Sequence, residues 1–181
     1  MGYKFFYYLL LSSIIIPIFL YKLIPPSHFV GGLIGFMFLI GLAGSLVGVA
    51  ATAIKNAKKK RQQLLMAGAY DIASLTPLQF EKYCGILLED SGWRVEYTDI
   101  TGDYGADIIA HKNGQKMIVQ CKHYTSNVGV SAVQEAFSAK AYYHAHKAIV
   151  VASRGGFTNA ARSLAMRTGV KVLSPVDLKK L

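Results

Sequence analysis

The sequence predicts an α/β fold: a mixed β-sheet flanked by helices in the order α-β-β-β-α-β-α-β, preceded by two transmembrane helices. Charge divides the 181-residue chain, because residues 1–54 hold two of the 20 Lys and Arg residues and none of the 10 Asp and Glu residues. Residues 55–181 carry 18 basic and 10 acidic residues, a net charge of +8. We therefore expect a membrane anchor over 1–54, a basic juxtamembrane connector over 55–73 and an α/β domain over 74–181.

Two apolar runs form the predicted anchor. Residues 5–24 and 29–54 are each long enough to cross a bilayer core as a helix, and the second run contains no Lys, Arg, Asp or Glu. Basic residues follow the second run from Lys55 to Arg61, whereas the loop between the runs is short and poor in charge. The positive-inside rule then predicts a multi-pass protein of the inner (cell) membrane, with both termini and the α/β domain in the cytoplasm.

Two features of the anchor leave alternatives open. Small residues at helical spacing, such as Gly44 and Gly48, favour packing of the two spans within one chain, with a homodimer as the alternative. The basic run Lys58–Arg61 is expected to contact lipid headgroups of the bilayer, and nucleic acid is its alternative partner.

Helix and strand signals alternate through the α/β domain. A first helix begins at Thr76-Pro77, where Gln79 is placed to complete a capping box, and it ends at Gly92. The alternation of apolar and polar residues over 93–98 predicts the first strand. The later elements are strands at 106–111 and 116–123, a helix that Ser131 caps and that ends near His144, a strand at 147–152, a helix at 158–167 and a strand at 170–173. This order is typical of a mixed sheet covered by helices.

A predicted hairpin in the middle of the domain contains the main candidate site residues. Asn113-Gly114 between two apolar runs predicts a two-residue turn, which places Asp107 opposite Gln120 on one face of the sheet. Lys122, two residues further on, points to the same face. Carboxylate and amide oxygens suit Mg²⁺, and a lysine beside them can hold a phosphate oxygen or position a water molecule. The alternative is a solvated Lys–Asp pair on the surface.

Several blocks of residues resemble the catalytic domain of Mrr-type restriction endonucleases. The blocks are Phe80-Glu81, Gly102–Ala110, Val119–Tyr124, Val133–Glu135, Val150–Thr158 and Gly169–Leu173, and the resemblance extends over about 74–178. This group is a branch of the PD-(D/E)xK nuclease superfamily with Gln in place of the second acid. The resemblance implies a restriction-endonuclease-like fold and a Mg²⁺ cofactor. It also implies that Asp107 binds the metal, Gln120 takes the second ligand position and Lys122 is the catalytic lysine.

Further residues are weaker candidates for the same site. Glu81 in the first helix either completes the metal shell or is a solvated glutamate. Asp103 is either another ligand or a loop-capping residue, and Gln134 either faces the site or lies on the surface.

Basic residues outside the hairpin are candidate contacts for a DNA backbone. Lys140 and Lys147 flank a stretch rich in tyrosine and histidine, and Arg154 precedes a predicted helix whose N–H groups can hold a phosphate. A solvated helix end is the alternative for the first two.

The two cysteines, Cys84 and Cys121, exclude a disulfide scaffold and suit a reducing compartment. Cys121 and His123 lie two residues apart on one strand, where a buried structural cysteine is a better interpretation than a nucleophilic pair.

These observations favour a membrane-anchored, Mg²⁺-dependent DNA endonuclease of the Mrr (type IV) restriction kind, with DNA and the lipid bilayer as partners. One alternative is a catalytically silent module of the same fold that tethers DNA to the membrane. Another is a membrane scaffold whose soluble domain binds protein.

Overall fold

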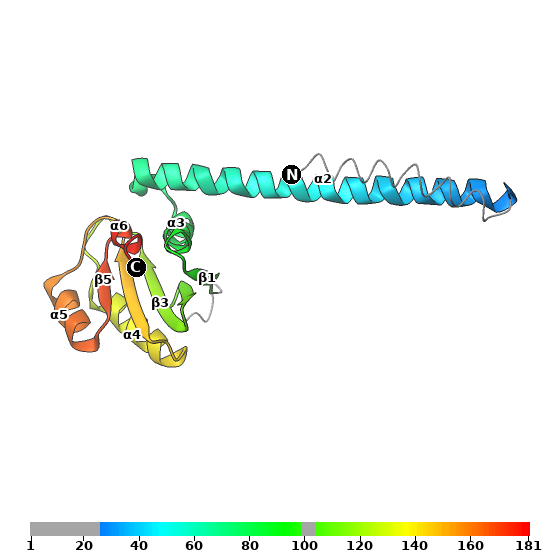
Figure 1. The fold of residues 1–181 in the computed structure, drawn as a ribbon. Helices are drawn as coiled ribbons and strands as arrows, with labels where there is room; N and C mark the ends of the chain where they lie inside the picture. Colours follow the sequence, from blue (N-terminus) through cyan, green and yellow to red (C-terminus); the bar gives the residue numbers. More distant parts are fainter. Residues whose placement is uncertain (1–25, 99–103) are drawn as a thin grey trace. The chain divides into compact units, whose positions relative to one another are not determined.

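The computed structural model describes residues 26–98 and 104–181 (Figure 1). The chain forms two compact units, Met1–Ala57 and Lys58–Leu181. The predicted first span at 5–24 and the candidate Asp103 lie outside the described residues.

Helix α2 (Pro26–Tyr70) contains the predicted second span. Among the described residues it is the one helix long and apolar enough to cross a membrane, with a mean hydropathy of 2.1 in its most apolar part. The helix continues through the basic run to Tyr70 and is followed by a short 3₁₀ helix, η1 (Ile72–Ser74). The segment expected as a connector is therefore mostly a continuation of α2. The first transmembrane helix stays a prediction.

Five strands form one mixed sheet in the order β1-β2-β3-β4-β5. The strands are β1 (Arg94–Tyr97), β2 (Ile108–Lys112), β3 (Gln115–Lys122), β4 (Lys147–Ala152) and β5 (Lys171–Leu173). The first three are antiparallel neighbours, whereas β4 runs parallel to β3 and β5 runs parallel to β4. The predicted mixed α/β sheet is confirmed.

Four helices accompany the sheet: α3 (Pro77–Asp90), α4 (Val130–Tyr142), α5 (Asn159–Thr168) and α6 (Pro175–Leu178). The predicted capping box of α3 is present, since the backbone N–H of Thr76 donates to Oε1 of Gln79 at 2.8 Å and the N–H of Gln79 donates to Oγ1 of Thr76 at 3.2 Å. Helix α6 is an addition to the predicted order.

The predicted cap of α4 is wrong. Ser131 lies inside the first turn, and the N-cap is Gly129, which makes no side-chain capping bond. The preceding residue, Val128, is held by a parallel bridge to Phe157, so the chain leaves this bridge extended and turns into the helix at Val130. The helix also ends earlier than expected, at Tyr142.

Two apolar clusters cover the two faces of the sheet. One joins the buried face of α3 to Met117, Val119 and Cys121 of β3, and the other joins α4 and α5 to Ile118 of β3 and Val150 of β4. Because side chains alternate along a strand, Gln120 and Lys122 share the face of Ile118, which α4 covers.

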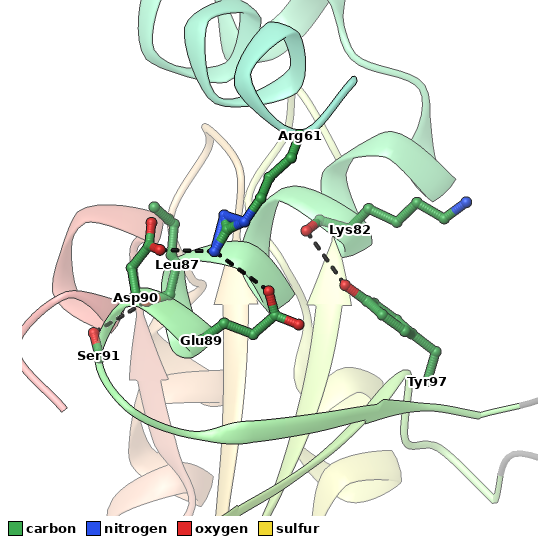
Figure 2. Close-up of polar contacts among 7 residues, drawn as sticks. All are labelled: Arg61, Lys82, Leu87, Glu89, Asp90, Ser91 and Tyr97. Atoms are coloured by element: carbon green, nitrogen blue, oxygen red, sulfur yellow. Dashed lines mark hydrogen bonds and ion pairs between the residues drawn. The ribbon is translucent and has the colours of Figure 1, made fainter. Parts of the chain in front are cut away.

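The last turns of α2 belong to the α/β domain. Leu64, Leu65 and Ala67 pack against the cluster beneath α3. Figure 2 shows Arg61 reaching the end of α3, where its Nη2 lies 2.7 Å from Oδ1 of Asp90 and 3.4 Å from Oε2 of Glu89. These contacts attach the end of α2 to the domain through both apolar packing and charge.

Candidate active site

The hairpin has the predicted geometry. Asn113 and Gly114 have φ values of 51° and 74°, as a two-residue turn with both φ angles positive requires. The register pairs Lys112 with Gln115 and Ile108 with Val119, so Asp107 and Gln120 come next along the two strands.

Asp107 is bound to β3 through its carboxylate. Its Oδ2 accepts hydrogen bonds from Nε2 of Gln120 at 2.9 Å and from the backbone N–H of Cys121 at 2.5 Å. Its own N–H donates to the carbonyl oxygen of Val119 at 3.0 Å. The structure therefore brings Asp107 and Gln120 together at the end of the hairpin, as the register predicted.

Gln120 carries an unsatisfied oxygen. The residue is 4% exposed, and its Oε1 has no hydrogen-bond partner among the described residues. Leaving a buried acceptor unpaired typically costs about 1–3 kcal/mol. A divalent cation beside the Asp107 carboxylate would satisfy this oxygen, because Mg²⁺ prefers hard oxygen ligands.

Water and substrate phosphates are expected among the remaining ligands of such a cation. Within the part of the chain that the structure describes, no group of three or more His, Cys, Asp and Glu side chains is gathered to hold a metal. This donor set still fits Mg²⁺, which is commonly bound through one or two carboxylates and completes its coordination with water and substrate phosphates.

Lys122 ends β3 and forms an ion pair with Glu135 of α4. Its Nζ lies 2.7 Å from Oε2 of Glu135, and its side chain is 17% exposed. Burial lowers the pKa of Lys122, but the hydrogen bond and the negative charge of Glu135 outweigh burial, so the pKa is raised overall. Lys122 is therefore a cation at neutral pH, a state suited to holding a phosphate oxygen.

Sequence reasoning named Gln134 and missed Glu135. Gln134 is exposed on α4, whereas Glu135 is half-buried and borders the stripe that Ala132, Ala136 and Ala139 bury against the sheet. The spacing of these alanines was the signal that could have identified Glu135, because residues three and four apart share a helix face.

Glu81 lies near the other side of β3. It is half-buried in the first turns of α3. The pKa of the Cys121 thiol is raised by its hydrogen bond with Cys84, then by burial, and further by the nearby charges of Asp107 and Glu81. Glu81 is thus within electrostatic reach of the end of β3.

Cys121 and His123 have packing partners rather than one another. Cys121 is buried against Cys84, and the ring of His123 stacks on Phe80 with centroids 5.2 Å apart. A buried thiol with a raised pKa is a poor nucleophile. These contacts agree with the structural interpretation of Cys121.

The three basic candidates do not form one surface. Arg154 follows β4 at the end of the sheet that Lys122 occupies, and its Nη2 lies 3.8 Å from Oδ1 of Asp71. Lys147 opens β4 at the other end, about 17 Å away at the usual rise of a strand, and Lys140 lies in the last turn of α4 near it. Of these three residues, only Arg154 lies at the same end of the strands as Asp107, Gln120 and Lys122.

Helices α4 and α5 both begin at this end of the sheet, beyond the carboxyl ends of β3 and β4. Two backbone hydrogen bonds join the loops before α4 and α5. The N–H of Val128 donates to the carbonyl oxygen of Gly156 at 2.9 Å, and the N–H of Thr158 donates to the carbonyl oxygen of Val128 at 3.0 Å. Ligands commonly bind outside the carboxyl ends of parallel strands, and helix N-termini favour anions there. The site of Asp107, Gln120 and Lys122 thus lies at the end of the strands where a phosphate group is expected to bind.

The restriction endonuclease family of the Mrr catalytic domain matches residues 72–181. The chain therefore belongs to this family, and the resemblance seen over 74–178 is confirmed for the α/β domain.

The solved structures that the chain matches include those of AspBHI, EndoMS and MspJI. The DNA modification-dependent restriction endonuclease AspBHI is 19% identical with a TM-score of 0.46, covering 67% of this chain and 34% of its own. EndoMS in its apo form is 14% identical with a TM-score of 0.42, covering 56% of this chain and 46% of its own. The MspJI restriction endonuclease in complex with a 27-mer oligonucleotide is 17% identical with a TM-score of 0.39, covering 67% of this chain and 30% of its own.

The matched region thus spans less than half of each of these three chains. No match was found among curated proteins.

Proposed function

We propose that the chain is a membrane-anchored DNA endonuclease that uses a divalent metal ion, Mg²⁺ in the simplest case. The observation that carries the proposal is the pair formed by the Asp107 carboxylate and the unsatisfied, buried Oε1 of Gln120. Membership of a restriction endonuclease family supports the same activity.

Each residue of the site has a separate task in this proposal. Asp107 supplies the negative charge that holds the metal, and Gln120 supplies a neutral oxygen ligand. A bound Mg²⁺ would polarise the phosphate and lower the pKa of a coordinated water. The cationic Lys122 stabilises the negative charge that develops on the phosphate oxygens during hydrolysis.

Two further observations support DNA as the substrate. Residues 55–181 have a net charge of +8, which favours a polyanionic partner. Arg154 and the N-termini of α4 and α5 lie at the same end of the strands as Lys122.

Plasmid cleavage tests the proposal directly. The full chain in detergent or in a reconstituted bilayer is incubated with supercoiled plasmid in Mg²⁺, in Mn²⁺ and in EDTA. We expect nicked or linear products with a divalent metal and none in EDTA. Intact plasmid under every metal condition would contradict the proposal.

One observation favours a second candidate, a silent module that tethers DNA to the membrane. Lys122 already pairs with Glu135 in the structure, so part of its positive charge is compensated before any phosphate binds, which weakens the stabilisation it can give to a reacting phosphate. DNA binding without cleavage in the same assay would support this candidate.

The anchor is part of the proposal. The apolar part of α2 and the basic residues that follow it support a cell-membrane location with the nuclease domain in the cytoplasm.

A further inference from the structure

Glu135 contacts both Lys122 and the segment that leads to Asp107. Its carboxylate pairs with Nζ of Lys122 at 2.7 Å, across the gap between α4 and the end of β3. Lys122 is 17% exposed and the Glu135 side chain 41%, so the pair lies at the border between the core and the solvent. An ion pair in this position orients the lysine more firmly than a fully exposed pair would.

The backbone of Glu135 touches the segment that leads to Asp107. Gly105, two residues before Asp107, has a φ of +86°, and a Cβ atom there would lie 2.8 Å from both Cβ and the carbonyl oxygen of Glu135. Real Cβ atoms do not approach this closely, so only glycine lets the chain rest on α4 at this point. The path of the chain into β2 is therefore set against Glu135.

We propose that Glu135 is a positioning residue of the nuclease site, an inference that rests on the proposed function. Its side chain fixes the ammonium group of Lys122, and its backbone fixes the approach of the strand that carries Asp107. One residue of α4 thus relates the position of the lysine to that of the metal-binding carboxylate.

Removing the charge of Glu135 is expected to affect turnover and DNA affinity differently. A carboxylate next to a phosphate site repels the phosphate, so removing it leaves DNA affinity unchanged or strengthens it. Removing the orienting contact lets Lys122 move, and misplacement by about 1 Å can lower a rate roughly 100-fold. Glu135 variants are thus expected to lose turnover without losing affinity.

The test compares three Glu135 variants in the full chain. Glu135→Asp, Glu135→Gln and Glu135→Ala are assayed for single-turnover plasmid cleavage in Mg²⁺ and for DNA affinity in EDTA. We expect cleavage to fall in that order, by roughly 10- to 100-fold for Glu135→Ala. We expect DNA affinity equal to or higher than that of the parent, and thermal unfolding within a few degrees of it.

Glu89→Gln is the matched control. It also removes one carboxylate, at the far end of α3, and leaves Arg61 its 2.7 Å contact with Asp90. This variant should cleave within about two-fold of the parent. If Glu135→Ala cleaves as fast as the parent, or loses affinity and stability together with rate, the positioning role is excluded.

A second measurement does not depend on cleavage. Limited acylation of lysines, followed by peptide mass spectrometry, reports how well each amine is protected. Lys122 should react faster in Glu135→Gln than in the parent, while Lys180, 78% exposed, serves as the internal reference. Equal reactivity of Lys122 in both proteins would overturn the inference even where the parent cleaves DNA. A parent that never cleaves, with Lys122 still protected by Glu135, would instead refute the proposed function.

Discussion

At the scale of single residues, Asp107 has a structural role besides the metal-binding role proposed for it, because its carboxylate accepts two hydrogen bonds from β3. Replacing it by alanine would leave the N–H of Cys121 and Nε2 of Gln120 without an acceptor, at a cost of about 1–3 kcal/mol each. Asp107→Asn keeps the shape and an acceptor oxygen while removing the charge that would hold the proposed metal. We expect Asp107→Asn to abolish Mg²⁺-dependent plasmid cleavage and to keep DNA binding in EDTA, measured by fluorescence anisotropy. Cleavage at the parental rate would show that the site is misassigned.

Gln120→Glu is a second test at this scale. The variant creates the two-acid arrangement of the wider superfamily but replaces the Nε2 donor with a second carboxylate beside Asp107. Repulsion between the carboxylates destabilises the metal-free protein, and a divalent metal relieves it. We therefore expect a lower melting temperature in EDTA, a larger rise on adding Mg²⁺ than the parent shows, and retained cleavage with an altered preference among metals. An identical response of parent and variant to Mg²⁺ would argue against a metal at this position.

The pairing of Asp107 with Gln120 could be predicted because a two-residue Asn-Gly turn leaves only one register. For Glu135 the alanine spacing indicates only a position beside the buried face of α4, and no local pattern places it opposite Lys122. In α4 the large Phe137 is 46% exposed, whereas the small Ala132, Ala136 and Ala139 are buried. Small alanines let the helix lie close to the sheet, which hydrophobicity alone does not reveal.

At the scale of elements, the end of α2 belongs to the fold of the nuclease domain. The sequence predicted the five strands and the helices α3, α4 and α5 of this domain within one or two residues, because periodicity and turns are local signals, but it missed the short helix α6. It did not predict the attachment of α2, since the packing of Leu64 and Leu65 depends on a partner surface beneath α3 that no local pattern encodes.

Truncation tests this attachment. A chain that begins at residue 74 lacks Leu64, Leu65, Ala67 and the Arg61 contacts with α3, whereas one that begins at Lys58 keeps them. Burial of this apolar surface contributes roughly 2–4 kcal/mol. We expect the shorter chain to unfold at a clearly lower temperature or to aggregate, as judged by circular dichroism and size-exclusion chromatography. Equal melting temperatures would show that α2 adds nothing to the domain.

At the scale of the whole molecule, charge distinguishes DNA from protein as the partner. Neutralising phosphates with lysine and arginine releases counterions, so affinity falls steeply as salt increases. If six or more phosphates are contacted, the affinity of residues 58–181 for duplex DNA should fall by about 10³-fold between roughly 50 and 200 mM salt. Filter binding over this range measures the slope. A flat response would favour a protein-binding scaffold.

The topology of the chain is the remaining prediction at this scale. The basic residues from Lys55 to Arg61 follow the apolar part of α2 and should stay in the cytoplasm, together with the nuclease domain and its substrate. A reporter enzyme fused after Leu181 is therefore expected to give a cytoplasmic signal. A second reporter at the N-terminus tests the span predicted at 5–24: a cytoplasmic signal there requires two spans, and a periplasmic signal requires α2 to cross alone. A periplasmic signal at Leu181 would contradict both the orientation and DNA as the substrate, because the site would then lie in a compartment without chromosomal DNA.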